Sequence, residues 1–268
     1  MEAGLSAIDW QRPWLAPWRA VGEAAAARVR AGACVADALA AQAAAGGCRE
    51  TPATEPGVAF VPQHCLPAGQ AYESFIRAHR QVPTRDNLHD FFNGLVWLRY
   101  PAAKRRMNQL QAEAIAAQGV GAVRGPLRDA LTVFDENGAL WSAPAPLRAA
   151  LLARDWYGLF VRHRALWAQA RLVLWGHALL EKLVMPYKSI IAHVLVLPEQ
   201  PPDHPAADAW LAQALQPEVW RTKPFAPLPV LGVPGWWAAN EDPAFYDDTA
   251  VFRPHAARAR QIPAIDGA

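Results

Sequence analysis

Hydrophobic residues recur at helical spacing between residues 84 and 100 and predict one well-defined helix there. The apolar positions form a single stripe that would face a core, namely Leu88, Phe91, Phe92, Leu95 and Leu98. Thr84 is suited to the N-cap, because its hydroxyl can accept a hydrogen bond from an N–H group of the first turn. Pro101 ends the helix, because a proline disfavours helical backbone at the residue before it.

The opposite face of this predicted helix is polar. Asp86, His89, Asp90 and Asn93 fall together on a wheel of about 100° per residue, with Arg85 at the edge of the patch. One interpretation is a solvated first turn with local ion pairs. The other is a functional site, in which Asp86, His89, Asp90 and Asn93 carry catalysis. The sequence leaves both interpretations open.

The remaining pattern predicts further elements and a fold class. We expect helices over residues 18–45 (with a break near Gly32), 70–80, 101–119, 156–185 and 206–215, and strands over 58–62 and 190–197. Asn137 and Gly138 lie between apolar runs and predict a hairpin over residues 131–141. Residues 217–254 form an irregular arm rich in Pro and Trp. The predicted fold is α+β and mainly helical, with a small, largely antiparallel sheet and this arm.

Composition suggests three parts of the chain. We expect an Ala-rich helical extension over residues 1–50, a main domain over 51–254 and a frayed tail over 255–268. The 53% hydrophobic content and the 12 tryptophans exclude a largely disordered chain.

Charge and cysteine content restrict the partners and the compartment. A net charge of +2 does not indicate nucleic acid. Cys34, Cys48 and Cys65 contain no CxxC pair, so we expect neither a disulfide framework nor a thiolate zinc site, which fits a reducing cytoplasm. We expect no secretory signal at the N-terminus. The longest charge-free run of the most apolar stretch, residues 172–180, is far shorter than the roughly 20 residues of a membrane span, so we expect no membrane partner.

Several segments carry a resemblance that no single one of them would support. They are TRDNLHDFFNGLVWLRYP, RGPLRDALTVFDENGAL, GHALLEKL, VLGVPGWW and NEDPAFYDD. In this order the chain resembles, over residues 58–254, a bacterial family known only as domain of unknown function 3025. The resemblance implies a bacterial origin and a shared fold. It implies no activity and no catalytic residues.

A possible divalent metal site follows from the spacing of His177 and Glu181. The two residues are four positions apart in the predicted helix of residues 156–185, so both lie on one flank. An imidazole and a carboxylate placed in this way can ligate one divalent ion, with His89, Asp86 or Asp90 as the partner. The competing interpretation is an intrahelical His–Glu pair, because the HExxH pattern of metalloproteases is absent.

A second candidate is a binding site for a small anionic ligand. Arg124 and Arg128 surround the turn or helix start at Pro126, and with Arg85 they could form a corner of forked donors. The competing interpretation is that these arginines bridge to acidic residues between elements.

No motif in the sequence identifies a reaction. GxxxxGK[ST], GxGxxG and GxSxG are all absent, which disfavours nucleotide binding by the common loops and α/β-hydrolase chemistry. The favoured hypothesis is an enzyme or small-ligand-binding domain with a polar pocket on the helix of residues 84–100. The alternative is a non-catalytic protein-interaction module that uses the aromatic arm, unless Trp236, Trp237 and Phe245 are buried.

Overall fold

The computed structural model describes residues 2–46, 57–119, 125–197 and 206–254, and it confirms the α+β, mainly helical fold. The chain forms two compact units, and each is built from three separate segments. Unit 1 consists of Met1–Trp10, Pro17–Thr132 and Pro202–Thr222, whereas unit 2 consists of Gln11–Ala16, Val133–Pro201 and Lys223–Ala268. Two elements belong partly to each unit, because the chain crosses a unit boundary inside them. They are η1 (Pro13–Trp18) and α7 (Pro126–Asn137).

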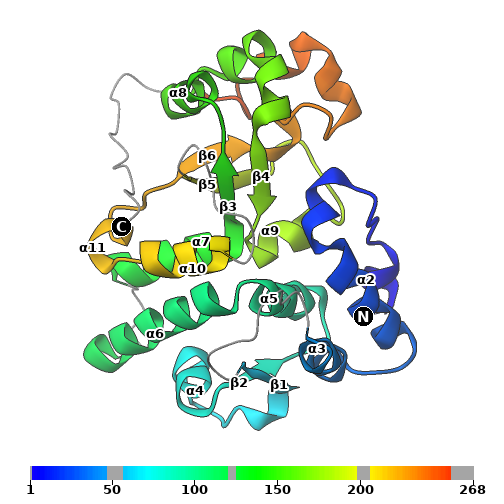
Figure 1. Ribbon diagram of the computed structural model, residues 1–268, viewed down its shortest axis with the longest axis vertical. Coiled ribbons are helices and arrows are strands. Elements are labelled where there is room, and N and C mark those ends of the chain that lie inside the picture. The colour runs from blue at the N-terminus through cyan, green and yellow to red at the C-terminus, as the bar shows by residue number, and fades with distance from the viewer. Residues whose placement is uncertain (1, 47–56, 120–124, 198–205, 255–268) are drawn as a thin grey trace. The chain divides into compact units, whose positions relative to one another are not determined.

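Unit 1 is helical around one pair of short strands. Its other elements are α1 (Glu2–Ser6), α2 (Arg19–Arg30), α3 (Val35–Ala44), β1 (Ala59–Pro62), η2 (Gln63–Cys65), α4 (Tyr72–His79), β2 (Gln81–Thr84), α5 (Leu88–Arg99), α6 (Pro101–Gln118), α10 (Ala206–Ala214) and α11 (Pro217–Trp220). β1 and β2 pair in parallel, with Phe60 opposite Val82. α3 packs on β1 and α4 packs on β2 (Figure 1).

The central helix of unit 1 is α5, and every residue from Asp90 to Leu98 is buried. Its predicted start at Thr84 is wrong, because Thr84 is the last residue of β2 and its hydroxyl donates to the carbonyl of Val82 (2.9 Å). Asn87 is the N-cap instead, and its side chain accepts from the N–H of Asp90 (2.8 Å).

Two close approaches hold the neighbours of α5 in place. A Cβ at Gly94 of α5 would lie 2.1 Å from Cδ1 of Leu39, so α3 contacts the backbone of α5 directly. α6 begins at Pro101, and the N–H groups of Ala102 and Ala103 donate to the Asp208 carboxylate of α10 (2.9 and 2.8 Å). Asp208 therefore satisfies two of the N–H groups that a helix start leaves without an intrahelical acceptor.

Unit 2 contains a four-stranded sheet in the order β4-β3-β5-β6. Its elements are β3 (Gly138–Ser142), α8 (Ala145–Ala153), η3 (Gly158–Arg162), η4 (Arg164–Gln169), β4 (Arg171–Leu174), α9 (His177–Lys182), β5 (Ile191–Val196), β6 (Ala226–Pro229), η5 (Val230–Gly232), η6 (Ala238–Glu241) and η7 (Pro243–Asp247). β3 and β5 pair in parallel at the centre, and the two outer pairings are antiparallel (Figure 1). The predicted strand over residues 190–197 is confirmed as β5.

The predicted hairpin over residues 131–141 is wrong. α7 continues to Asn137, and β3 begins at Gly138 and pairs with β4 and β5. Gly138 lacks the positive φ that the expected turn requires. A Cβ at Gly138 would lie 2.4 Å from the carbonyl oxygen of Phe134. Because glycine has no Cβ, β3 can begin directly after the last turn of α7 without this clash.

The predicted helix over residues 156–185 is also wrong, because this stretch divides into η3, η4, β4 and α9. Its apolar residues face neighbours on several sides, a pattern that a buried strand shares with a buried helix. Leu172 and Leu174 pair with Trp141 and Ala139 of β3. The side chain of Asp155 accepts from the N–H of Gly158 (2.8 Å) and so caps the turn that leads into η3.

The C-terminal arm is irregular, as predicted, and side-chain hydrogen bonds hold it in place. The Asn240 amide donates to the carbonyls of Leu231 and Val233 (both 2.8 Å). The Tyr246 hydroxyl donates to the carbonyl of Gly232 (2.9 Å), and Arg164 forms an ion pair with Glu241 (2.6 Å). Within the described ranges, no helix is both long enough and apolar enough to span a membrane.

Candidate functional site

The two carboxylates of the predicted catalytic face each make a structural contact. Asp90 is buried and accepts hydrogen bonds from the backbone N–H, Nε and Nη2 of Arg85 (2.7, 3.1 and 2.8 Å). Asp86 is exposed and accepts from the N–H of Val35 (2.7 Å), the first residue of α3. His89 is half-buried in the first turn of α5. A shared catalytic role for these side chains stays a prediction.

Asn93 joins a polar network that is buried between α4, α5 and α6. Its amide oxygen accepts from Nζ of Lys104 (2.9 Å), and its amide nitrogen donates to the Tyr72 hydroxyl (3.3 Å). One turn further along α6, the Asn108 amide donates to the carbonyl and the carboxylate of Glu73 (2.9 and 2.5 Å). Lys104 is only 5% exposed, so its hydrogen bonds replace most of its contacts with water.

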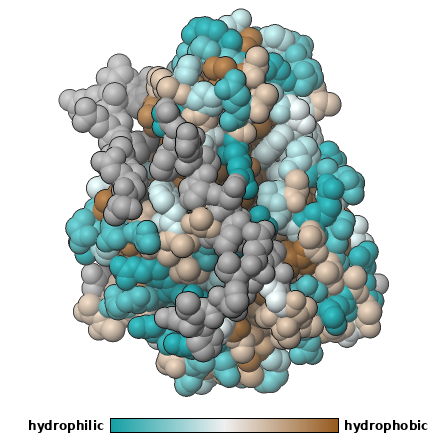
Figure 2. Space-filling model, viewed as in Figure 1, coloured by the Kyte–Doolittle hydropathy of each residue, from teal (hydrophilic) through white to brown (hydrophobic). Residues whose placement is uncertain are grey.

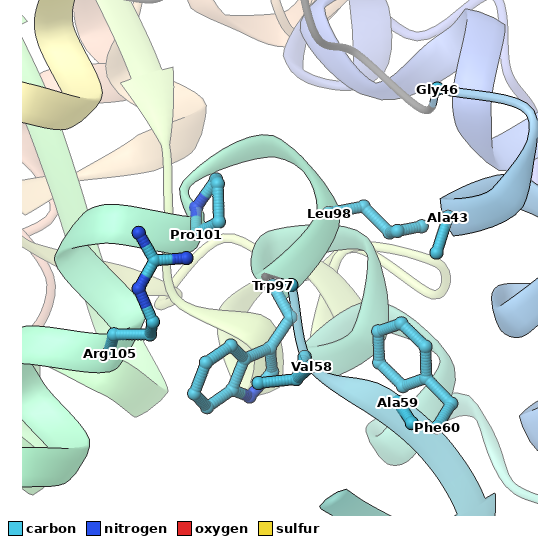
Figure 3. A pocket seen from close by; sticks show the side chains of 10 residues that line it. Ala43, Gly46, Val58, Ala59, Phe60, Trp97, Leu98, Pro101 and Arg105 are labelled. Atoms are coloured by element: carbon cyan, nitrogen blue, oxygen red, sulfur yellow. The ribbon is translucent and has the colours of Figure 1, made fainter. Parts of the chain in front are cut away.

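A cavity of about 260 Å³ opens beside the C-terminal half of α5, and we call it the α5 cavity. Its lining is mainly apolar and comes from α3, β1, α5 and the start of α6, with Phe60, Trp97, Leu98 and Pro101 as the larger members. Among the described residues of the lining, Arg105 is the one that carries a charge. Figure 3 shows Arg105 on the α6 side of the cavity and Ala43 on the α3 side, with Trp97 and Phe60 between them.

Trp97 connects the α5 cavity to the polar network. The Lys104 ammonium lies 5.3 Å from the centroid of the Trp97 ring, within the range of a cation–π interaction. Lys104 is in turn held by Asn93, so the indole ring is fixed from the side of the network. The cavity therefore has a rigid aromatic wall and a guanidinium group at its α6 side.

Two of the three predicted anion-binding arginines lie within the described residues. Arg85 pairs with Asp90, and Arg124 lies outside the described residues. Arg128 lines a second cavity of about 230 Å³, together with Arg221 of the segment after α11. Within the described ranges, neither Arg128 nor Arg221 makes an ion pair. An anion site formed by Arg85, Arg124 and Arg128 stays a prediction.

The predicted metal set divides between the units, since His89 belongs to unit 1 and His177 and Glu181 belong to unit 2. Within unit 2, buried His177 faces two acidic residues at the end of α7. Its Nδ1 lies 3.9 Å from Oδ1 of Asp135, and its Nε2 lies 3.8 Å from Oε2 of Glu136. We call Asp135, Glu136 and His177 the His177 cluster. The full set of His89, His177 and Glu181 stays a prediction.

His193 lies on β5. This strand pairs with β3, which begins two positions after Glu136 of the His177 cluster. His193 pairs with Gly138, and its ring contacts Phe225 edge-on at 5.7 Å. Burial lowers the pKa of His193 below its usual value, and the charges of Lys223 and Lys182 lower it further. The half-buried imidazole is therefore neutral at pH 7.

The burial of the three aromatic side chains in the arm neither supports nor excludes the interaction module. Trp236, Trp237 and Phe245 are half-buried rather than fully buried or exposed. On the face shown in Figure 2, hydrophilic residues lie between the hydrophobic ones among the coloured atoms. Met185 and Tyr187 of unit 2 are more exposed, at 74% and 50%. A partner surface on the arm stays a prediction.

Sequence reasoning missed the residues that line the structural sites. In the sequence, Arg105 lies within the predicted helix of residues 101–119 and Phe60 within the predicted strand of residues 58–62, and nothing in either pattern marks them as binding residues. Asp135 and Glu136 lie within the predicted hairpin of residues 131–141, where nothing in the sequence pattern connects them with a histidine. Pairing them with His177 requires the fold, because Glu136 and His177 are 41 positions apart in the sequence.

Comparison with known proteins adds a family. A family model described as protein of unknown function (DUF3025) matches residues 58–256, which bears out the resemblance. No curated protein and no solved structure matches the chain.

Proposed function

The chain belongs to the family of proteins of unknown function DUF3025, whose description assigns no activity, and we propose that unit 1 binds a small organic acid in the α5 cavity. The proposal keeps the hypothesis of a small-ligand-binding domain centred on α5. It replaces the polar first turn of that helix by the apolar C-terminal half as the binding surface.

The observation that carries the proposal is that one guanidinium group lies among otherwise apolar residue types in the described part of the cavity lining. Ligand sites are typically apolar with a few polar groups that fix orientation. The Trp97 ring and the Phe60 ring supply flat apolar surface, which suits an aromatic or aliphatic body. Arg105 supplies forked donors, which match a carboxylate.

The size and rigidity of the cavity restrict the ligand further. Its volume of about 260 Å³ is near the lower limit of common ligand pockets, roughly 300–1,000 Å³. The ligand is therefore small. Because Lys104 and Asn93 hold Trp97 on the side of the polar network, little side-chain ordering is needed on binding.

The test is a binding screen with matched neutral probes. Phenylacetate, indole-3-acetate and hexanoate are each compared with their carboxamides, by saturation-transfer NMR and thermal shift on the full chain. We expect at least one acid to bind and its amide to bind more weakly. Losing a charged hydrogen bond costs about 1.5–3 kcal/mol, so Arg105→Gln should weaken the acid about 10- to 150-fold.

Two variants make this result specific. Arg106→Gln removes the neighbouring positive charge outside the cavity lining and should leave the affinity unchanged. Ala43→Leu places a larger side chain in the cavity and should abolish binding of acid and amide alike. Equal loss in Arg105→Gln and Arg106→Gln, or binding that survives Ala43→Leu, would place the ligand elsewhere.

We also propose a bacterial, cytoplasmic location. The support is the bacterial family that the sequence resembles and the absence of a CxxC pair among the three cysteines. Fractionation of the native host tests it, with the protein expected in the soluble cytoplasmic fraction.

A further inference from the structure

We propose that unit 2 binds a divalent transition-metal ion of the zinc class through Nε2 of His177 and the Glu136 carboxylate, with Asp135 as the positioning residue. This site is separate from the α5 cavity in its unit, its residues and its ligand. Imidazole nitrogen and carboxylate oxygen are ligands that such ions accept.

The first support is the distance between the two ligand atoms. Nε2 of His177 and Oε2 of Glu136 lie 3.8 Å apart. With metal–ligand bonds of about 2.1 Å, this separation corresponds to an angle of about 130° at the ion. A closing movement of a few tenths of an ångström would give the tetrahedral angle, and water would supply the remaining ligands.

The second support is the group on the other ring nitrogen. Nδ1 of His177 faces Oδ1 of Asp135 at 3.9 Å, so the two nitrogens of one imidazole face two different carboxylates. A metal-bound histidine generally directs its other N–H to a carboxylate or carbonyl, which fixes the tautomer. Asp135 is suited to this role, and it leaves Nε2 as the metal-binding nitrogen.

The third support is the rigidity of the two segments that carry the cluster. The N–H groups of Trp175 and Gly176 donate to the carbonyl of Gly138 (2.9 and 2.8 Å). A Cβ at Gly176 would lie 2.5 Å from the backbone nitrogen of Asn137, so only glycine allows this approach. Nζ of Lys182 donates to the Asn137 side chain (3.0 Å). His177 therefore follows a turn that is fixed against Glu136 and Asp135.

The competing interpretation is a protonated His177 paired with both carboxylates. Direct charge-assisted hydrogen bonds between these groups would be about 2.7–2.9 Å long. The two distances in unit 2 are about 1 Å longer, which leaves space for an ion at Nε2. Metal titration distinguishes the two, because a ring nitrogen that keeps its proton has no lone pair with which to ligate an ion.

The experiment titrates Zn²⁺ into the EDTA-treated and dialysed full chain by calorimetry, with Co²⁺ absorption as a second readout. We expect one equivalent to bind at pH 7.5, a rise in melting temperature and Co²⁺ ligand-field bands. His177→Ala and Glu136→Gln should each weaken binding at least 10-fold. Asp135→Asn should weaken it about 10- to 100-fold while one equivalent still binds. Binding should weaken as the pH is lowered, because an imidazole must be deprotonated to ligate a metal ion.

Controls make the proposal refutable even if one variant fails to fold. Glu136 is partly exposed, so Glu136→Gln tests the site should His177→Ala not fold. Glu218→Gln removes an exposed carboxylate from unit 1 and should leave Zn²⁺ binding unchanged. Glu181→Gln tests the sequence-predicted pair. Absence of binding at 100-fold excess Zn²⁺, binding that persists in Glu136→Gln, or loss in Glu181→Gln in its place would each overturn the proposal.

Discussion

Gly94→Ala tests the packing that shapes the wall of the α5 cavity, because Gly94 is where α5 touches α3. The new Cβ would lie 2.1 Å from Cδ1 and 2.9 Å from Cδ2 of Leu39. Carbon atoms in contact are about 3.5–4.0 Å apart, so Leu39 or all of α3 must move by more than about 1 Å. Leu39 is fully buried and has no solvent to turn into.

The expected magnitude is the difference between two opposing effects. Overpacking of a core costs about 1–3 kcal/mol. Replacing a glycine inside a helix gains about 0.5–1 kcal/mol. We therefore expect Gly94→Ala to lower the free energy of unfolding by about 1–2 kcal/mol, although the substitution improves helix propensity. α3 also contributes Ala43 to the cavity, so binding of the organic acid should weaken in the same variant.

Urea unfolding of the full chain, followed by far-UV circular dichroism, measures this loss. A double-mutant cycle with Leu39→Ala identifies the cause. Leu39→Ala alone should cost about 2–5 kcal/mol. In the double variant the Cβ at position 94 enters the emptied space, so the total should fall short of the sum by about 1 kcal/mol or more. A Gly94→Ala protein as stable as the parent, or strictly additive losses, would refute the close approach.

Two further predictions follow from single contacts. Asp86→Ala removes the acceptor at the start of α3 and should lower the free energy of unfolding by about 1 kcal/mol, whereas Glu23→Ala at an exposed position of α2 should have no effect in the same urea assay. Folding lowers the pKa of His193. Below the unfolded pKa of about 6.5, the unfolded chain therefore binds a proton that the folded chain does not, and the free energy of unfolding decreases as the pH decreases. His193→Gln should reduce the loss of stability between pH 7 and pH 5, and an unchanged pH dependence would contradict the lowered pKa.

Local signals in the sequence predicted the elements whose ends are marked by Pro or Gly or whose residues are rich in β-branched side chains. Pro101 and Gly119 marked α6, and the β-branched run before residue 198 marked β5. The failures occurred where tertiary pairing decided between two acceptable states. Leu172 and Leu174 fit a buried helix as well as they fit the edge of a sheet, and only β3 determines the outcome. Asn137 and Gly138 have the composition of a hairpin turn, but the neighbouring helix end uses them.

The candidate sites were predictable only in part for the same reason. His177 could be recognised as a possible metal ligand from its spacing of four residues from Glu181. Its neighbours could not, because they come from the end of α7 rather than from positions four residues away. Asp86 and Asp90 formed one patch on a helical wheel. In the fold they contact different elements, since α5 begins after Asp86.

The cap that Asp208 provides to α6 has a consequence for how the chain is made. During translation, Asp208 is added 105 residues after Ala103. At common synthesis rates this is a delay of about 5–20 s. During that interval the first turn of α6 lacks its acceptor, and the side that will pack on α10 has no partner. Folding of unit 1 therefore finishes only after most of unit 2 has been synthesised. A nascent chain that pauses before residue 206 would be a target for chaperones and proteases.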